Sequence, residues 1–210
     1  MKVVKWILTA VVALLLAAVV STFFMSENFR VYQTQVIKAP PEAIYNQLVT
    51  VKNWENWSYW KTLDDKMVTT YNDIPSGVGA SYSWKSDKKS VGNGSLTVVR
   101  VDPNQYVQCK LTFDGHPDAM AEYILRPVPG GTELTSAMNS PTKGIFDKLM
   151  SRLMGKPMMH KAFKASAENM EAYLQNNPDT GSMIDSLATA IKADTSTAGN
   201  TPKNSMDKKK

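Results

Sequence analysis

Three side chains in this sequence have the chemistry of a nucleophile, a general base or a soft metal ligand: Cys109, His116 and His160. Covalent catalysis needs a nucleophile within hydrogen-bond distance of its base. Cys109 lies among alternating apolar residues, so we expect a buried, inert thiol with a raised pKa. We expect His116 in a solvated turn and His160 on a helix surface. The sequence therefore identifies no catalytic residue, and we expect neither a metal site nor a cofactor, because the two histidines and scattered carboxylates lack metal-ligand spacing.

Apolar residues at alternating positions give a stronger signal. Because side chains alternate across a strand, residues two apart share a face. Four predicted strands between residues 95 and 139 each have one face with few polar groups. That composition is typical either of a packed core or of the wall of an apolar cavity. The residues on these faces are Leu96, Val98, Val107, Cys109, Leu111, Phe113, Ala121, Tyr123, Leu125, Thr132, Leu134, Ser136 and Met138.

An aromatic run, Trp54, Trp57, Tyr59 and Trp60, lies between the first predicted helix and the second predicted strand. Such rings either fix this segment by packing against the sheet or form the rim of a cavity. A ring with an apolar body and a polar edge suits an amphipathic ligand or a lipid interface. Both interpretations are consistent with the sequence.

The sequence predicts a series of short strands followed by one long helix, and the residues named above lie on or between these elements. Alternation interrupted by Gly, Pro, Asn and Asp predicts an antiparallel sheet. A helix should begin at Pro41 and Glu42, since Pro fits the first helical position and Glu favours the helix dipole there. After Pro141 the period becomes helical, and Pro157 should break or kink this helix. The predicted strands are residues 31–38, 67–72, 79–85, 95–101, 105–113, 120–128 and 132–139.

The amino-terminal segment is long and apolar enough to cross a bilayer. Residues 6–26 carry no charge, and as a helix they would extend roughly 31 Å. A cleaved signal peptide is the alternative, but the apolar stretch is longer than is usual and lacks a clear Ala-x-Ala site. We therefore predict a cytoplasmic stub at residues 1–5, a transmembrane anchor at 6–26, and an extracytoplasmic domain, because Lys2 and Lys5 precede the span.

Composition and charge exclude other classes of protein. The chain has 210 residues, of which 43% are hydrophobic, and this is enough for a substantial core. The net charge of +5 is spread along the chain without a basic face, so we expect no nucleic-acid partner. A single cysteine excludes a disulfide framework. Residues 176–210 have the polar composition of a disordered tail.

Four segments together resemble the bacterial polyketide cyclase/dehydrase branch of the START-like, or SRPBCC, superfamily. They are APPEAIY at 39–45, NWENWSYW at 53–60, GVGASYSW at 77–84 and VGNGS at 91–95, and Pro127 with the Gly-Gly-Thr run at 130–132 fits as well. The resemblance implies an α+β helix-grip fold over residues 27–175. In that fold a curved seven-stranded antiparallel sheet surrounds the long carboxyl-terminal helix, with an apolar cavity between them.

Combined with strand parity, the resemblance predicts which residues line that cavity. Ser136 is of particular interest because related sequences tend to carry a bulky aromatic there. The predicted lining is Trp57, Trp60, Leu96, Val98, Cys109, Leu111, Phe113, Tyr123, Leu125, Leu134, Ser136, Met138, Met159 and Phe163.

The sequence favours a membrane-anchored domain that binds a hydrophobic or amphipathic small molecule, such as a lipid, in this cavity. One alternative is a cyclase or dehydratase that folds its substrate in the same cavity, which requires an acid or base inside. The other is a non-catalytic interaction module at the membrane, which would have a filled core.

Overall fold

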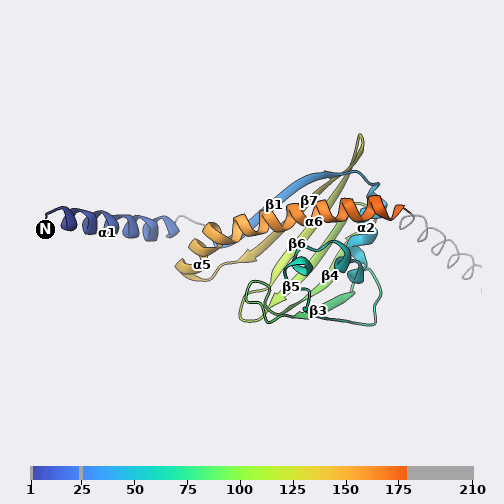
Figure 1. Cartoon of the computed structure of the whole chain (residues 1–210), viewed down its shortest axis with the longest axis horizontal. Coiled ribbons are helices and arrows are strands. Elements are labelled where there is room, and N and C mark those ends of the chain that lie inside the picture. The colour runs from blue at the N-terminus through green and yellow to red at the C-terminus, as the bar shows by residue number, and fades with distance from the viewer. Residues whose placement is uncertain (1, 24–25, 179–210) are drawn as a thin grey trace, which may run out of the picture.

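A computed structural model of the chain describes residues 2–23 and 26–178 (Figure 1). It contains seven strands, and the helices lie before, between and after them. The helical elements are α1 (Lys2–Phe23), α2 (Pro41–Val49), η1 (Val51–Asn53), α3 (Trp54–Trp57), α4 (Tyr59–Leu63), α5 (Gly144–Met150), the π-helical turn η2 (Ser151–Gly155) and α6 (Lys156–Asn176). The strands are β1 (Asn28–Ile37), β2 (Val68–Tyr71), β3 (Ser81–Lys85), β4 (Gly94–Asp102), β5 (Tyr106–Phe113), β6 (Ala119–Val128) and β7 (Gly131–Pro141).

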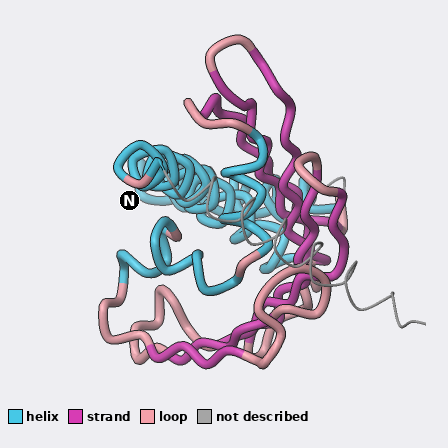
Figure 2. Tube along the Cα trace, turned by 90° about the vertical axis from the view of Figure 1, so that its right-hand side faces the viewer, coloured by secondary structure: helices cyan, strands magenta, loops and turns pink. Residues whose placement is uncertain are grey.

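The strands form one antiparallel sheet in the order β1-β7-β6-β5-β4-β3-β2. All seven predicted strands are present, and β1 begins at Asn28, three residues before the predicted start. Figure 2 shows the sheet curling around the helices. A register shift between Val98 and Arg100 marks a bulge in β4, which adds to the twist of that strand. This is the helix-grip arrangement that the sequence predicts.

The predicted parity of the central strands is confirmed. On β5 the buried residues are Val107 and Cys109, and on β6 they include Ala121, Tyr123 and Leu125. Tyr123 pairs with Ser136 of β7, so the inner faces of neighbouring strands are in register. The alternation of apolar and polar residues is enough to determine which face of each strand is buried. A shift of the strand register by one residue would turn every apolar side chain to the solvent-exposed face.

Helix α6 packs across the inner face of the sheet (Figure 1). Its buried residues recur every three or four positions, as one apolar stripe requires. The stripe contributes to two separate apolar clusters. One contains Met170 and Leu174 with α2 and most of the sheet, and the other contains Met159 and Phe163 with Phe29 and Val31. The core is thus divided along the length of the helix.

A break or a kink is predicted at Pro157; the structure shows no break there, and the hydrogen-bond pattern changes in the turn before it. Pro157 lies in the first turn of α6, where its missing N–H is tolerated, and the π-helical turn η2 precedes it. The chain therefore continues as α5, η2 and α6. The apolar residues that recur at helical spacing from Phe146 to Met154 are largely exposed, because α5 and η2 extend beyond the edge of the core.

Among the described residues, one helix is long and apolar enough to cross a membrane, at Lys2–Ser21. Signal sequences and core helices pass the same test, but the large apolar side chains of α1 are exposed rather than packed in a core. α1 projects away from the sheet beside α5 (Figure 1). The predicted tail at 176–210 falls, except for its first three residues, outside the described part of the chain.

Candidate ligand-binding cavity

A cavity of about 430 Å³ lies between the sheet and α6. Its wall contains Phe29, Met159 and Phe163 from one apolar cluster, and Trp54 and Tyr123 from the other. The cavity thus separates the two halves of the core. Packed interiors have few voids larger than a water molecule, whereas small-molecule sites range from roughly 300 to 1,000 Å³. Its volume is that of a ligand site.

A series of aromatic rings forms one wall of the cavity. The Trp54 ring lies edge-on to Tyr123, with centroids 5.7 Å apart, and 6.1 Å from the Tyr82 ring. Tyr82 contacts Trp84 at 5.7 Å, and Trp84 contacts Phe113 at 5.8 Å. These are the separations at which aromatic pairs are favourable. The wall therefore has a continuous apolar surface with defined ring orientations.

Two contacts hold the two indole rings of this wall in place. The indole Nε1 of Trp54 donates a hydrogen bond to the carbonyl oxygen of Leu48 at 3.0 Å, which ties the ring to α2. Gly94 pairs with Trp84 across β3 and β4, and a Cβ at Gly94 would lie 2.6 Å from Cζ2 of Trp84. The missing side chain at Gly94 therefore makes room for the indole.

Besides its two indole N–H groups, the aromatic wall carries two phenol hydroxyls. Burial raises the pKa of Tyr82 and of Tyr123 above the usual value, so both remain protonated across the physiological range. Neither hydroxyl bonds to another residue in the described part of the chain, although both residues line the cavity. Each is available to donate a hydrogen bond to a ligand. The neighbouring Cys109 is buried, as predicted from the sequence, and burial raises the pKa of its thiol to about 12.

Charged and titratable groups lie toward the solvent-exposed parts of the cavity. Glu55 accepts a hydrogen bond from the Tyr71 hydroxyl at 2.5 Å. Burial, followed by this carboxylate, raises the pKa of Tyr71. His116 and Asp147 also line the cavity and are exposed. The cavity therefore combines an apolar interior with polar margins.

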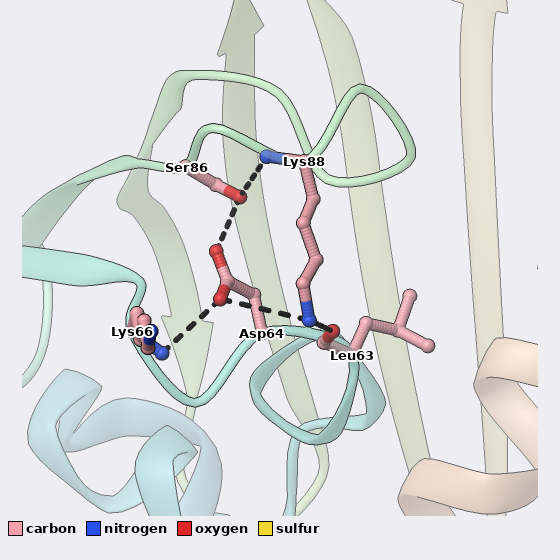
Figure 3. Close-up of polar contacts among 5 residues, drawn as sticks. All are labelled: Leu63, Asp64, Lys66, Ser86 and Lys88. Atoms are coloured by element: carbon pink, nitrogen blue, oxygen red, sulfur yellow. Dashed lines mark hydrogen bonds and ion pairs between the residues drawn. The ribbon is translucent and has the colours of Figure 1, made fainter.

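A polar cluster fixes the loop that closes one side of the cavity (Figure 3). The buried carboxylate of Asp64 accepts hydrogen bonds from the Ser86 hydroxyl at 2.6 Å and from the backbone N–H of Lys66 at 3.1 Å. Lys88 Nζ donates to the Leu63 carbonyl at 2.7 Å and lies 3.8 Å from Asp64. These contacts join the end of α4 to the β3–β4 loop. That loop carries Ser90 and Val91, which both line the cavity.

Comparison with known proteins shows which family the chain belongs to. A family model described as "Polyketide cyclase / dehydrase and lipid transport" matches residues 28–175. The chain belongs to this SRPBCC-type polyketide cyclase/dehydrase family. Among curated proteins, the comparison finds no match to this sequence.

Solved structures share the fold of this family member at low sequence identity. A protein of unknown function, SA2116, from Staphylococcus aureus superposes with a TM-score of 0.57 at 12% identity, covering 73% of this chain and 97% of that one. Ara h 8.0201 has a TM-score of 0.54 at 13% identity, with 71% and 99% covered. A Mesorhizobium loti protein has a TM-score of 0.51 at 18% identity, with 70% and 98% covered. Identities in this range establish the shared fold alone.

The structure of this polyketide cyclase/dehydrase family member brings half of the predicted lining residues to the cavity. They come from the aromatic segment, from β5 to β7 and from α6. Their role in binding a ligand stays a prediction. These residues are Trp60, Leu111, Phe113, Tyr123, Met138, Met159 and Phe163.

The other half lie in the packed core and not at the cavity. The inner faces were predicted correctly, but α2 and the second half of α6 fill the space above that part of the sheet. Ser136 illustrates the correction: it is buried on the predicted face, opposite Tyr123, yet it does not line the cavity. The expected space beside it is occupied. The residues corrected in this way are Trp57, Leu96, Val98, Cys109, Leu125, Leu134 and Ser136.

Several lining residues were not among those predicted. Parity does carry a signal for Tyr82 and Trp84, which share a strand face, but the sequence does not reveal whether that face points inward. Ala121 was on the predicted inner face and was left out of the lining. Met150 of α5 and Met158 of α6 could be found only from the path of the continuous helical segment α5–η2–α6. All five line the cavity.

Proposed function

We propose that this chain is a membrane-anchored binding protein for a hydrophobic or amphipathic small molecule with the character of a lipid. The observation that carries this proposal is the cavity of about 430 Å³ with its apolar, aromatic wall. A ligand that buries its apolar surface there gains about 25 cal/mol per Å². The hydroxyls of Tyr82 and Tyr123 would orient one polar group of the ligand. The words "lipid transport" in the family's description agree with this ligand class.

The anchor in this proposal is α1. Its large apolar side chains, from Val3 to Val20, are mostly exposed, and exposed apolar patches of this size are rare in soluble monomers. A bilayer would cover them. Lys2 and Lys5 precede the span, so the folded domain would lie on the extracytoplasmic side.

Binding is better supported than catalysis in the same cavity. A cyclase or dehydratase would need a proton donor or acceptor that titrates near neutral pH. The titratable side chains of the inner aromatic wall are Tyr82 and Tyr123, whose raised pKa keeps them protonated at that pH. The other titratable side chains of the lining, among them His116 and Asp147, lie at its exposed margin and away from the apolar interior. A filled interaction module is less consistent with a cavity of this volume. We therefore propose ligand binding as the function.

Filling the cavity provides the test. Ala121 lies on β6 in the cavity wall, so Ala121→Phe should occupy ligand space without compressing the core. Binding of the apolar fluorophore N-phenyl-1-naphthylamine should fall strongly, while the melting temperature is maintained or rises. Ala167→Phe on α6 is the matched control, because Ala167 is buried away from the cavity. That change should overpack the core at a cost of about 1–3 kcal/mol.

Two results would count against the proposal. If the wild-type chain fails to bind the fluorophore, the cavity is not an apolar ligand site. If Ala121→Phe lowers stability as much as Ala167→Phe does, the space beside Ala121 is already filled.

A further inference from the structure

The segment α5–η2 presents large apolar side chains to solvent. Phe146 of α5 is 73% exposed, and Leu153 and Met154 of η2 are 64% and 63% exposed. Ile145 of α5 is exposed to a lesser degree, as is Met158 in the first turn of α6. The other side of the same segment, including Met150 and Ser151, lines the ligand cavity. One short helical segment thus separates the cavity from an exposed apolar surface.

A row of cations runs beside this apolar surface. Lys148, Arg152 and Lys156 are four residues apart along the helical segment, and Arg30 of β1 joins them around a small pocket of about 190 Å³. One carboxylate, Glu27, pairs with Lys148 at 3.9 Å and is itself 88% exposed. In the described part of the chain, Arg30, Arg152 and Lys156 have no ion-pair partner. The pocket therefore has the charge to receive an anion.

Hydrogen bonds hold this segment close to the end of α1. The backbone N–H and the hydroxyl of Thr142 both donate to the carbonyl oxygen of Glu27, at 2.7 and 2.8 Å. Thr142 lies two residues before α5, and Glu27 lies four residues after Phe23, the last residue of α1. Even fully extended, the chain from Phe23 to Asn28 spans at most about 17 Å. If α1 crosses a bilayer, α5–η2 must lie near the surface of that bilayer.

We propose that α5–η2 docks on the anionic surface of the bilayer that holds α1. Phe146, Leu153 and Met154 insert among the acyl chains at the interface, and Arg30, Arg152 and Lys156 bind lipid phosphates. This inference rests on the proposed anchor and deepens it. The docked segment places one side of the ligand cavity against the membrane, so an apolar ligand can exchange between bilayer and cavity without crossing water.

Site-specific quenching of the full-length chain in vesicles tests this docking. Leu153→Cys is labelled with an environment-sensitive fluorophore, and quenching by a nitroxide-labelled phosphatidylcholine is measured with and without phosphatidylglycerol. Cys109 is fully buried and should stay unlabelled. Val36→Cys is the matched control, because Val36 is 53% exposed and lies at the opposite end of β1 from α1. We expect quenching several times stronger at Leu153 than at Val36, and stronger still with phosphatidylglycerol.

Charge variants test the proposed phosphate contacts. Arg152→Gln or Lys156→Gln should each lower the ratio of docked to undocked segment about fivefold in anionic vesicles. Lys89→Gln, on the exposed β3–β4 loop, should leave this ratio unchanged.

Carbonate washing of the same vesicles separates the two proposals. If the chain is retained but Leu153 is quenched no more than Val36, docking is wrong and the anchor stands. If carbonate releases the chain, the anchor is wrong and the docking inference fails with it. Equal quenching at Leu153 in neutral and anionic vesicles would overturn the role of the cations.

Discussion

At the scale of single residues, Asp64 shows how one buried carboxylate positions the cavity wall. The Ser86 hydroxyl, the backbone N–H of Lys66 and the Lys88 ammonium outweigh burial and lower the pKa of Asp64 below its usual value. Ionised Asp64 therefore joins the β3–β4 loop to the end of α4. This contact, together with the Lys88–Leu63 hydrogen bond, holds the loop that carries Ser90 and Val91, which both line the cavity.

This arrangement predicts an acid-sensitive contribution to stability. Because the folded pKa of Asp64 is below its unfolded value of about 3.9, the contribution is complete above that pH and is lost as pH falls through the folded pKa. Between about pH 5 and pH 2, the melting temperature of Asp64→Asn should therefore fall less than that of the wild type. Asp65→Asn, at the exposed neighbour, should keep the wild-type dependence. Identical slopes for Asp64→Asn and the wild type would contradict the assignment.

At the scale of elements, α6 serves both the packed core and the cavity. Met170 is buried in the larger apolar cluster, whereas Phe163 packs on one side and lines the cavity on the other. The cost of truncating a side chain depends on the space that is left behind. The two ends of the helix should respond differently to the same kind of change.

Phe163→Ala should cost less than the ~3–5 kcal/mol typical of a fully packed phenylalanine, because space already exists beside it. Met170→Ala should show the full cost of a packed site, about 2–5 kcal/mol. Urea unfolding of both variants measures the difference. A larger loss for Phe163→Ala than for Met170→Ala would mean that the cavity wall is closely packed.

The strands were predictable because alternation is a local signal. Residues such as Cys109 and Tyr123 were placed on the correct face of the correct strand without knowledge of their partners. How far the cavity extends along those strands was not predictable. It depends on where α2 and α6 cover the sheet, which is a non-local property. This is why Phe113 and Met138 were correctly placed at the cavity, whereas Val98 and Ser136 were not.

The exposed apolar face of α5–η2 likewise shows that a local sequence pattern does not reveal what an element packs against. Helical spacing from Phe146 to Met154 correctly indicates a helix, but spacing alone cannot distinguish a face that packs on a core from one that contacts a membrane. The structure shows that α5 lies beside α1 and that this face is exposed; its contact with a membrane stays a proposal.

At the scale of the whole molecule, the proposed arrangement is a membrane span followed directly by a ligand-binding domain. We expect the full chain to remain in membranes through a carbonate wash. A chain beginning at Glu27 should be soluble and folded, because the two apolar clusters lie within residues 29–174. Immunoblotting of the pellet and circular dichroism of the shortened chain measure the two outcomes. An amino terminus mapped near Ser21 in mature protein would show instead that the segment is cleaved.

Native mass spectrometry can detect an apolar molecule held in the cavity. The full-length chain is released from membranes in a mild detergent and ejected intact from the micelle. We predict a second species, heavier than the polypeptide by the mass of one small lipid-like molecule, and its loss in Ala121→Phe. A wild-type spectrum that shows only the bare polypeptide, even after incubation with N-phenyl-1-naphthylamine, would contradict binding of an apolar molecule in the cavity.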